Sequence, residues 1–114
     1  MGEMKDLLNE ANDSLGRFSK AWPEQMKGFG AFMQAVESPG ALDSKQKELI
    51  AVALSINAHC HWCIAYHVSG AMEKGATDKE VMEAAWVAVL MGGGPAVMYM
   101  QLVEKAVNEF KKKK

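Results

Sequence analysis

ELIAVALSINAHCHWCIAYH, residues 48–67, is the stretch of sequence that decides the fold. In its first half Glu48, Val52 and Ile56 recur every four residues, which is the spacing of one helix face. The sustained alternation of polar and apolar residues that indicates strands is nearly absent from the chain. The pattern therefore predicts an all-α protein in which two helices meet near Ala58-His59.

Capping residues, prolines and glycines divide the chain into six predicted helices that form a compact bundle. Asp43 with Gln46 makes one capping-box pattern, and Thr77 with Glu80 makes another. The run Gly92-Gly93-Gly94-Pro95 breaks the chain before the last helix. The predicted helices cover about residues 3–16 or beyond, 23–36, 43–58, 60–75, 77–91 and 95–110, and residues 111–114 form a solvated lysine tail.

Length and composition narrow the class of protein. The 114 residues suit a single domain over 1–114, and 49% hydrophobic residues exclude intrinsic disorder. A net charge of −1 offers no surface for a phosphate backbone, so we expect no nucleic-acid partner. The apolar runs are far shorter than the ~20 residues needed to cross a bilayer, and the amphipathic N-terminus resembles no signal peptide. We therefore expect a cytoplasmic protein without a membrane partner.

The run Ala84–Met91 is apolar at every position, which is more than one buried stripe requires. A small domain buries only about two-thirds of the surface of its unfolded chain. The run therefore predicts a homo-oligomer in which subunits cover it, and the alternative is the central helix of a monomer.

The motif Cys60-His61-Trp62-Cys63 carries the strongest chemical signal, and several interpretations of it compete. Haem attachment is excluded because Ile64 stands where a histidine is needed. Two cysteines are too few for an ordinary iron–sulfur cluster, and no strand precedes the motif as in thioredoxin. Zinc remains an alternative, and so do two buried cysteines without chemistry. The candidate zinc ligands are Cys60, Cys63, His67 and either His59 or His61.

A redox dithiol at a helix N-terminus is the interpretation that the spacing favours. Unpaired N–H groups there lower the pKa of a thiol, and Cys63 and His67 are four positions apart on one helix face. Glu48 is placed within one turn of His67 if the two helices form an antiparallel hairpin. Its carboxylate, on an otherwise apolar face, needs a partner such as the imidazole. The alternative is that Glu48 is an ordinary acid near a helix N-terminus, where acids are common.

The spacing E-x11-C-x-x-C-x3-H resembles the active-site signature of the alkylhydroperoxidase AhpD-like side of the carboxymuconolactone decarboxylase family, and the likeness covers about residues 40–100. The resemblance implies an all-α homo-oligomer, a trimer or hexamer, with thiol peroxidase or disulfide reductase activity and neither cofactor nor metal ion. It implies that Cys63 is the peroxidatic cysteine, Cys60 the resolving one, and Glu48 with His67 a proton relay. The expected partners are a hydroperoxide or disulfide substrate and a thiol reductant.

Physical reasoning also bears on which cysteine attacks. The helix dipole favours Cys60, but it contributes only about 0.3–2 kcal/mol. A positioned general base such as His67 contributes about 10²–10⁴-fold, which favours Cys63. AhpD carries a histidine where this chain has Trp62, and His61 stands one place earlier. Successive residues of a helix point in directions ~100° apart, so His61 is not expected to take over proton transfer. The decarboxylases of the family do not depend on a cysteine pair, so the motif argues against decarboxylation. Decarboxylation and a zinc-binding or purely structural oligomer without turnover are kept as alternative functions.

Overall fold

The computed structural model describes residues 2–111, and over that range it is all-α, as predicted. Five helices are labelled over that range where the sequence predicts six, because the last two predicted helices follow one another without a loop and only Gly93 departs from helical geometry between them. The predicted tail beyond Lys111 lies outside the described residues. The helices are α1 (Glu3–Ala21), α2 (Pro23–Glu37), α3 (Ser44–Asn57), α4 (His61–Glu73) and α5 (Asp78–Phe110).

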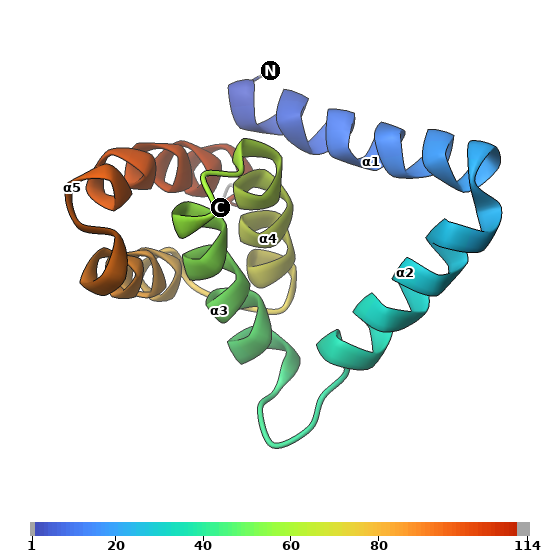
Figure 1. The fold of residues 1–114 in the computed structure, drawn as a ribbon. Coiled ribbons are helices and arrows are strands. Elements are labelled where there is room, and N and C mark those ends of the chain that lie inside the picture. Colours follow the sequence, from blue (N-terminus) through green and yellow to red (C-terminus); the bar gives the residue numbers. More distant parts are fainter. Residues whose placement is uncertain (1, 112–114) are drawn as a thin grey trace.

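Gly93 turns the chain back on itself within α5. Its φ of 62° and ψ of −143° lie where only glycine is comfortable, and the second half of the helix folds back beside the first (Figure 1). By length and composition α5 is apolar enough to be considered a membrane-spanning helix. The bend, however, leaves two shorter halves, and neither reaches the ~20 residues of a span.

Both predicted capping boxes are confirmed. Asp43 Oδ1 accepts from Gln46 N at 2.7 Å, while Gln46 Oε1 accepts from Asp43 N at 2.9 Å. Thr77 Oγ1 accepts from Glu80 N at 3.1 Å, and Glu80 Oε1 accepts from Thr77 N at 2.9 Å. These reciprocal bonds satisfy backbone donors that a helix start leaves open, so α3 and α5 begin where the sequence indicates.

The core lies where α3, α4 and both halves of α5 pack together, and α1 crosses one side of it. The two ends of the described chain meet there, because Glu109 near the end of α5 accepts from Lys5 N at 2.8 Å at the start of α1. The largest fully buried side chains are Met4, Ile56, Ile64, Val52, Val68, Val81 and Val103.

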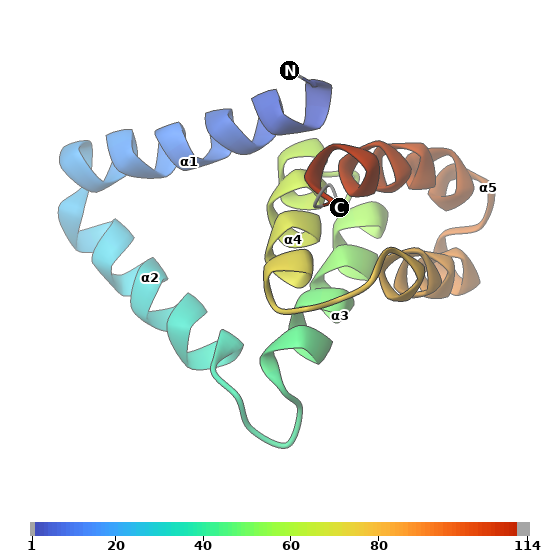
Figure 2. The same ribbon diagram turned by 180° about the vertical axis from the view of Figure 1, so that it is seen from behind.

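Helices α1 and α2 form an open V, which Figure 2 shows from behind. None of the residues of α2 is buried, so the helix is held mainly at its two ends. Lys47 Nζ of α3 donates to Val36 O at 2.6 Å and to Ser38 O at 2.5 Å, which fixes the C-terminal end of α2 beside α3. Residues of α1 and α2 thus lie opposite α4 and line one pocket with it.

The apolar run Ala84–Met91 is only partly covered within one chain. Ala85 and Ala88 point into the core, whereas Leu90 is 82% and Met91 88% exposed. The alternative that this run forms the buried central helix of a monomer is therefore wrong for the single chain.

Candidate active site

The two cysteines sit at the N-terminus of α4 and are joined as a disulfide, with their Cα atoms 5.2 Å apart. Cys60 is the N-cap of the helix, which therefore begins at His61, one position after the predicted start, and Cys60 Sγ accepts from Cys63 N at 3.1 Å. His59, at φ 55°, turns the chain sharply between α3 and α4. The fold therefore places the two sulfurs close enough to form a disulfide.

Glu48 and His67 form the hydrogen bond that the hairpin geometry predicts. Glu48 Oε1 lies 2.9 Å from His67 Nδ1, and the two side chains are only 15% and 21% exposed. With Glu48 ionised, Nδ1 carries the proton and donates, which leaves Nε2 as the acceptor on the ring. The carboxylate thus fixes the imidazole in the form that can accept a proton.

Gly70 makes room for this arrangement. A Cβ atom at position 70 of α4 would overlap Glu48 Oε2, so any larger residue would displace the carboxylate. The absence of a side chain at Gly70 therefore helps to place Glu48 against His67.

A pocket of about 710 Å³ opens between the α1–α2 wall and α4. Cys63 and His67 both line it, whereas Cys60 does not. Its wall is largely apolar in area, and Glu10, Asp13, Ser14 and Arg17 of α1 add polar groups to it. The apolar side chains that line it with the cysteine are Ala11, Leu15, Phe18, Phe29, Met33 and Trp62.

The remaining histidines lie elsewhere. The His59 ring stacks on Tyr99 at 4.7 Å between centroids, and the His61 ring meets the same tyrosine edge-on at 5.6 Å. With both sulfurs bonded to each other, the four-ligand zinc set considered from the sequence is not assembled in this structure.

Tyr66 lines the same pocket beside His67. Its ring contacts the His67 ring edge-on, with centroids 5.3 Å apart. Burial raises the pKa of the Tyr66 hydroxyl above its ordinary value, and the nearby charges of Glu37, Glu48 and Glu73 raise it further. Tyr66 is therefore a neutral hydrogen-bond donor at physiological pH.

Several site residues were not found from the sequence. Glu37, at the C-terminal end of α2, reaches the Glu48–His67 pair, while Phe29 and Met33 of the same helix line the pocket. From the sequence, Phe29 and Met33 fall only within the predicted helix over residues 23–36, and the apolar residues of that segment were the available signal. No local spacing links Glu37 to Glu48, because they meet only through the α2–α3 loop.

Comparison with known proteins identifies the family. Residues 23–103 match the carboxymuconolactone decarboxylase family, so the chain belongs to it, as the resemblance predicts. The apo crystal structure of a member from Legionella pneumophila superposes with a TM-score of 0.92 at 39% identity, covering 96% of this chain and 98% of that one.

Two relatives complete the comparison. A protein of the cox locus of Paracoccus denitrificans is 44% identical over 107 residues, which are 93% of this chain and 96% of that protein. The alkyl hydroperoxide reductase AhpD of Mycobacteroides abscessus is 33% identical over 64 residues, 56% of this chain and 36% of that protein. The AhpD likeness is thus confined to part of both chains.

Proposed function

We propose that the protein is a thiol-dependent peroxidase or disulfide reductase that works through Cys60 and Cys63. The observation that carries this proposal is that Cys63 and His67 open onto one pocket while Glu48 holds the other side of the imidazole. A nucleophile, a base and a group that orients the base are the parts of an activated thiol. The AhpD relative supports the same chemistry.

The cycle begins with the reduced pair. His67 Nε2 accepts the Cys63 proton, and the thiolate attacks the terminal oxygen of a hydroperoxide. The O–O bond breaks, the alkoxide takes a proton to leave as an alcohol, and Cys63 becomes a sulfenic acid. The Cys60 thiol then attacks that sulfur, and a disulfide and water form. A thiol reductant returns two electrons and two protons, which restores both thiols.

The structure offers a reason for the roles of the two sulfurs. Cys60 receives the Cys63 N–H, which favours a thiolate at Cys60, but this sulfur does not line the pocket. Cys63 faces the pocket together with His67. Access and general-base assistance thus coincide at Cys63, and an apolar wall suits an organic hydroperoxide.

The roles can be tested by trapping sulfenic acid with dimedone after dilute peroxide. We expect Cys60→Ser to form a trappable sulfenic acid at Cys63, and Cys63→Ser to form none at Cys60 at a comparable rate. Glu48→Gln and His67→Gln should each slow the first step, and the double variant should lose less than the product of the two effects, because the residues act as one unit.

Glu73→Gln is the matched control, because Glu73 is an exposed acid of α4 outside the Glu48–His67 pair. It should react like the parent protein. Faster trapping at Cys60 than at Cys63 would reverse the assignment. A parent protein whose intact mass does not fall by two hydrogens after peroxide treatment would contradict the proposed activity itself.

A further inference from the structure

A second pocket, of about 250 Å³, meets the active site at the Glu48–His67 pair. Glu48 lines this pocket, His67 lines the larger one, and Tyr66 lines both. Three carboxylates line the second pocket, those of Glu37, Glu48 and Glu73, and its lining contains no lysine, arginine or histidine. The pocket is therefore suited to a cation.

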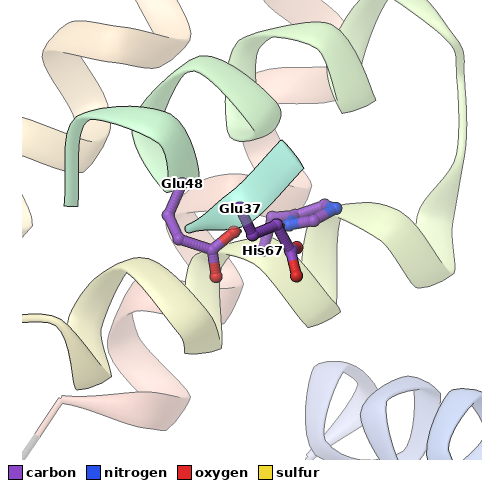
Figure 3. A group of neighbouring side chains, drawn as sticks. All are labelled: Glu37, Glu48 and His67. Carbon is purple, nitrogen blue, oxygen red and sulfur yellow. Dashed lines mark hydrogen bonds and ion pairs between the residues drawn. The ribbon is translucent and has the colours of Figure 1, made fainter. Parts of the chain in front are cut away.

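Three potential metal ligands converge at its inner end. Glu37 of α2, Glu48 of α3 and His67 of α4 each offer one atom, and these atoms lie within 4.8 Å of one another. Figure 3 shows the three side chains pointing toward a common centre from three different helices. None of the three is fully exposed. The three ligand residues are therefore held by three different helices of the fold.

Glu37 has no ion-pair partner within residues 2–111. The nearest lysine in sequence to Glu48, Lys47, directs its ammonium group to the carbonyl oxygens of Val36 and Ser38. This contact brings Glu37 to the cluster without neutralising it. Two carboxylates thus face one imidazole with no side-chain cation between them.

The distances suit a first-row transition metal. Zinc binds imidazole nitrogen and carboxylate oxygen at ~2.0–2.2 Å in tetrahedral geometry, so neighbouring ligand atoms around one ion lie about 3.3–3.6 Å apart. Glu48 Oε1 and His67 Nδ1 are 2.9 Å apart in their hydrogen bond and the three ligand atoms lie within 4.8 Å of one another, so small side-chain movements bring them to that spacing. Glu37, whose side chain has three rotatable bonds, needs only to turn inward to complete three ligands. An imidazole in the set favours zinc over magnesium.

We propose that Glu37, Glu48 and His67 form a binding site for a divalent transition-metal ion such as Zn²⁺, and that its occupancy switches off the thiol reaction. The ion binds His67 at Nδ1, so the single proton of the neutral imidazole moves from Nδ1 to Nε2. Nε2 is then no longer able to accept the Cys63 proton. The inhibitory part rests on the proposed function, whereas the binding part does not.

Binding is tested on the disulfide form, in which neither sulfur can act as a zinc ligand. Isothermal titration with ZnCl₂ in a non-chelating buffer should show one ion per chain. Glu37→Gln and His67→Gln should each weaken binding at least ~10-fold, since even the outer partners of a metal site cost that much. Glu73→Gln, which removes an acid of the same pocket but not of the cluster, should change affinity far less.

The outcomes separate the two proposals. Absence of zinc binding by the disulfide form, binding as tight in Glu37→Gln as in the parent, or equal binding of Mg²⁺ would each overturn the site. In a peroxide-consumption assay, the zinc concentration that halves the rate should rise at least ~10-fold in Glu37→Gln. An unchanged value would overturn the inhibitory part. A protein that binds zinc at the cluster but consumes no peroxide would contradict only the peroxidase.

Discussion

At the scale of single residues, the site depends on how Glu48 is held in a largely apolar surrounding. His67 binds one carboxylate oxygen, and the other oxygen lies over Gly70. A buried carboxylate without such partners is costly, so this geometry stabilises Glu48 in its place. A substitution at Gly70, which has no reactive group, should therefore slow the reaction of Cys63 with peroxide.

Gly70→Ala should slow the reaction of Cys63 with peroxide at least ~10-fold, because its Cβ pushes Glu48 away from His67 and weakens general-base assistance. The measurement is the rate of sulfenic acid trapping in a Cys60→Ser background. Gly28→Ala in α2, where nothing lies within 4 Å of an added Cβ, is the matched control. A Gly70→Ala protein as fast as this control would show that the position of Glu48 is unimportant.

Tyr66 predicts a specific response to alkaline pH. The pKa of its phenol is raised in the folded protein, so the associated stability is fully present below the unfolded value near 10 and is lost as pH rises through the folded value. Tyr66→Phe should therefore show a shallower loss of stability above about pH 10. Urea unfolding at a series of alkaline pH values measures the slope. The opposite slope change would contradict the raised pKa.

The part of the site that depends on local geometry could be predicted from the sequence. Cys63 and His67 are one helical turn apart, and Glu48 lies across a tight hairpin from them. Glu37 could not be found in this way. Its place depends on a loop and on the reach of Lys47 to two carbonyl oxygens, and neither leaves a periodic signal.

At the scale of helices, the starts of α3 and α5 were predictable because capping boxes are local. The end of α1 was not, since the helix continues through Gly16 to Ala21. A single glycine costs about 1 kcal/mol in a helix, and the flanking helical turns outweigh it here. The break at Gly93 was predicted from the Gly-Gly-Gly-Pro run. The sequence did not show that Gly93 alone leaves helical geometry and that the helix resumes at the next residue.

Lys47 holds the C-terminal end of α2, and with it Glu37, beside α3. Lys47→Met should release the end of α2 at a cost of about 1 kcal/mol, because two charge-assisted hydrogen bonds are lost at a solvated position. Amide hydrogen exchange over residues 30–40 should become faster.

Lys27→Met is the control for this effect, because Lys27 lies on α2 and makes no ion pair within the described residues. Exchange that is accelerated equally by both substitutions would mean that Lys47 does not fasten the helix.

At the scale of the whole molecule, the exposed side of Ala84–Met91 supports the expectation of a homo-oligomer. Val87→Asp should dissociate the assembly to 12.5 kDa chains that remain folded, because Val87 is 56% exposed within one chain. Val89→Asp should instead lower the stability of each chain, because Val89 packs against the core. Light scattering and thermal unfolding distinguish the two. A parent protein that is already a 12.5 kDa particle at micromolar concentration would contradict the expectation.

The contact between Glu109 and the first turn of α1 has a mechanical consequence. A force applied between residues 2 and 111 would load this contact first, because it joins the two ends of the described chain. Once this contact breaks, α1 can separate from the core one helical turn after another, starting at its N-terminal end. Tension on the ends would therefore strip away the wall of the larger pocket while the α3–α4 hairpin with its disulfide is still intact.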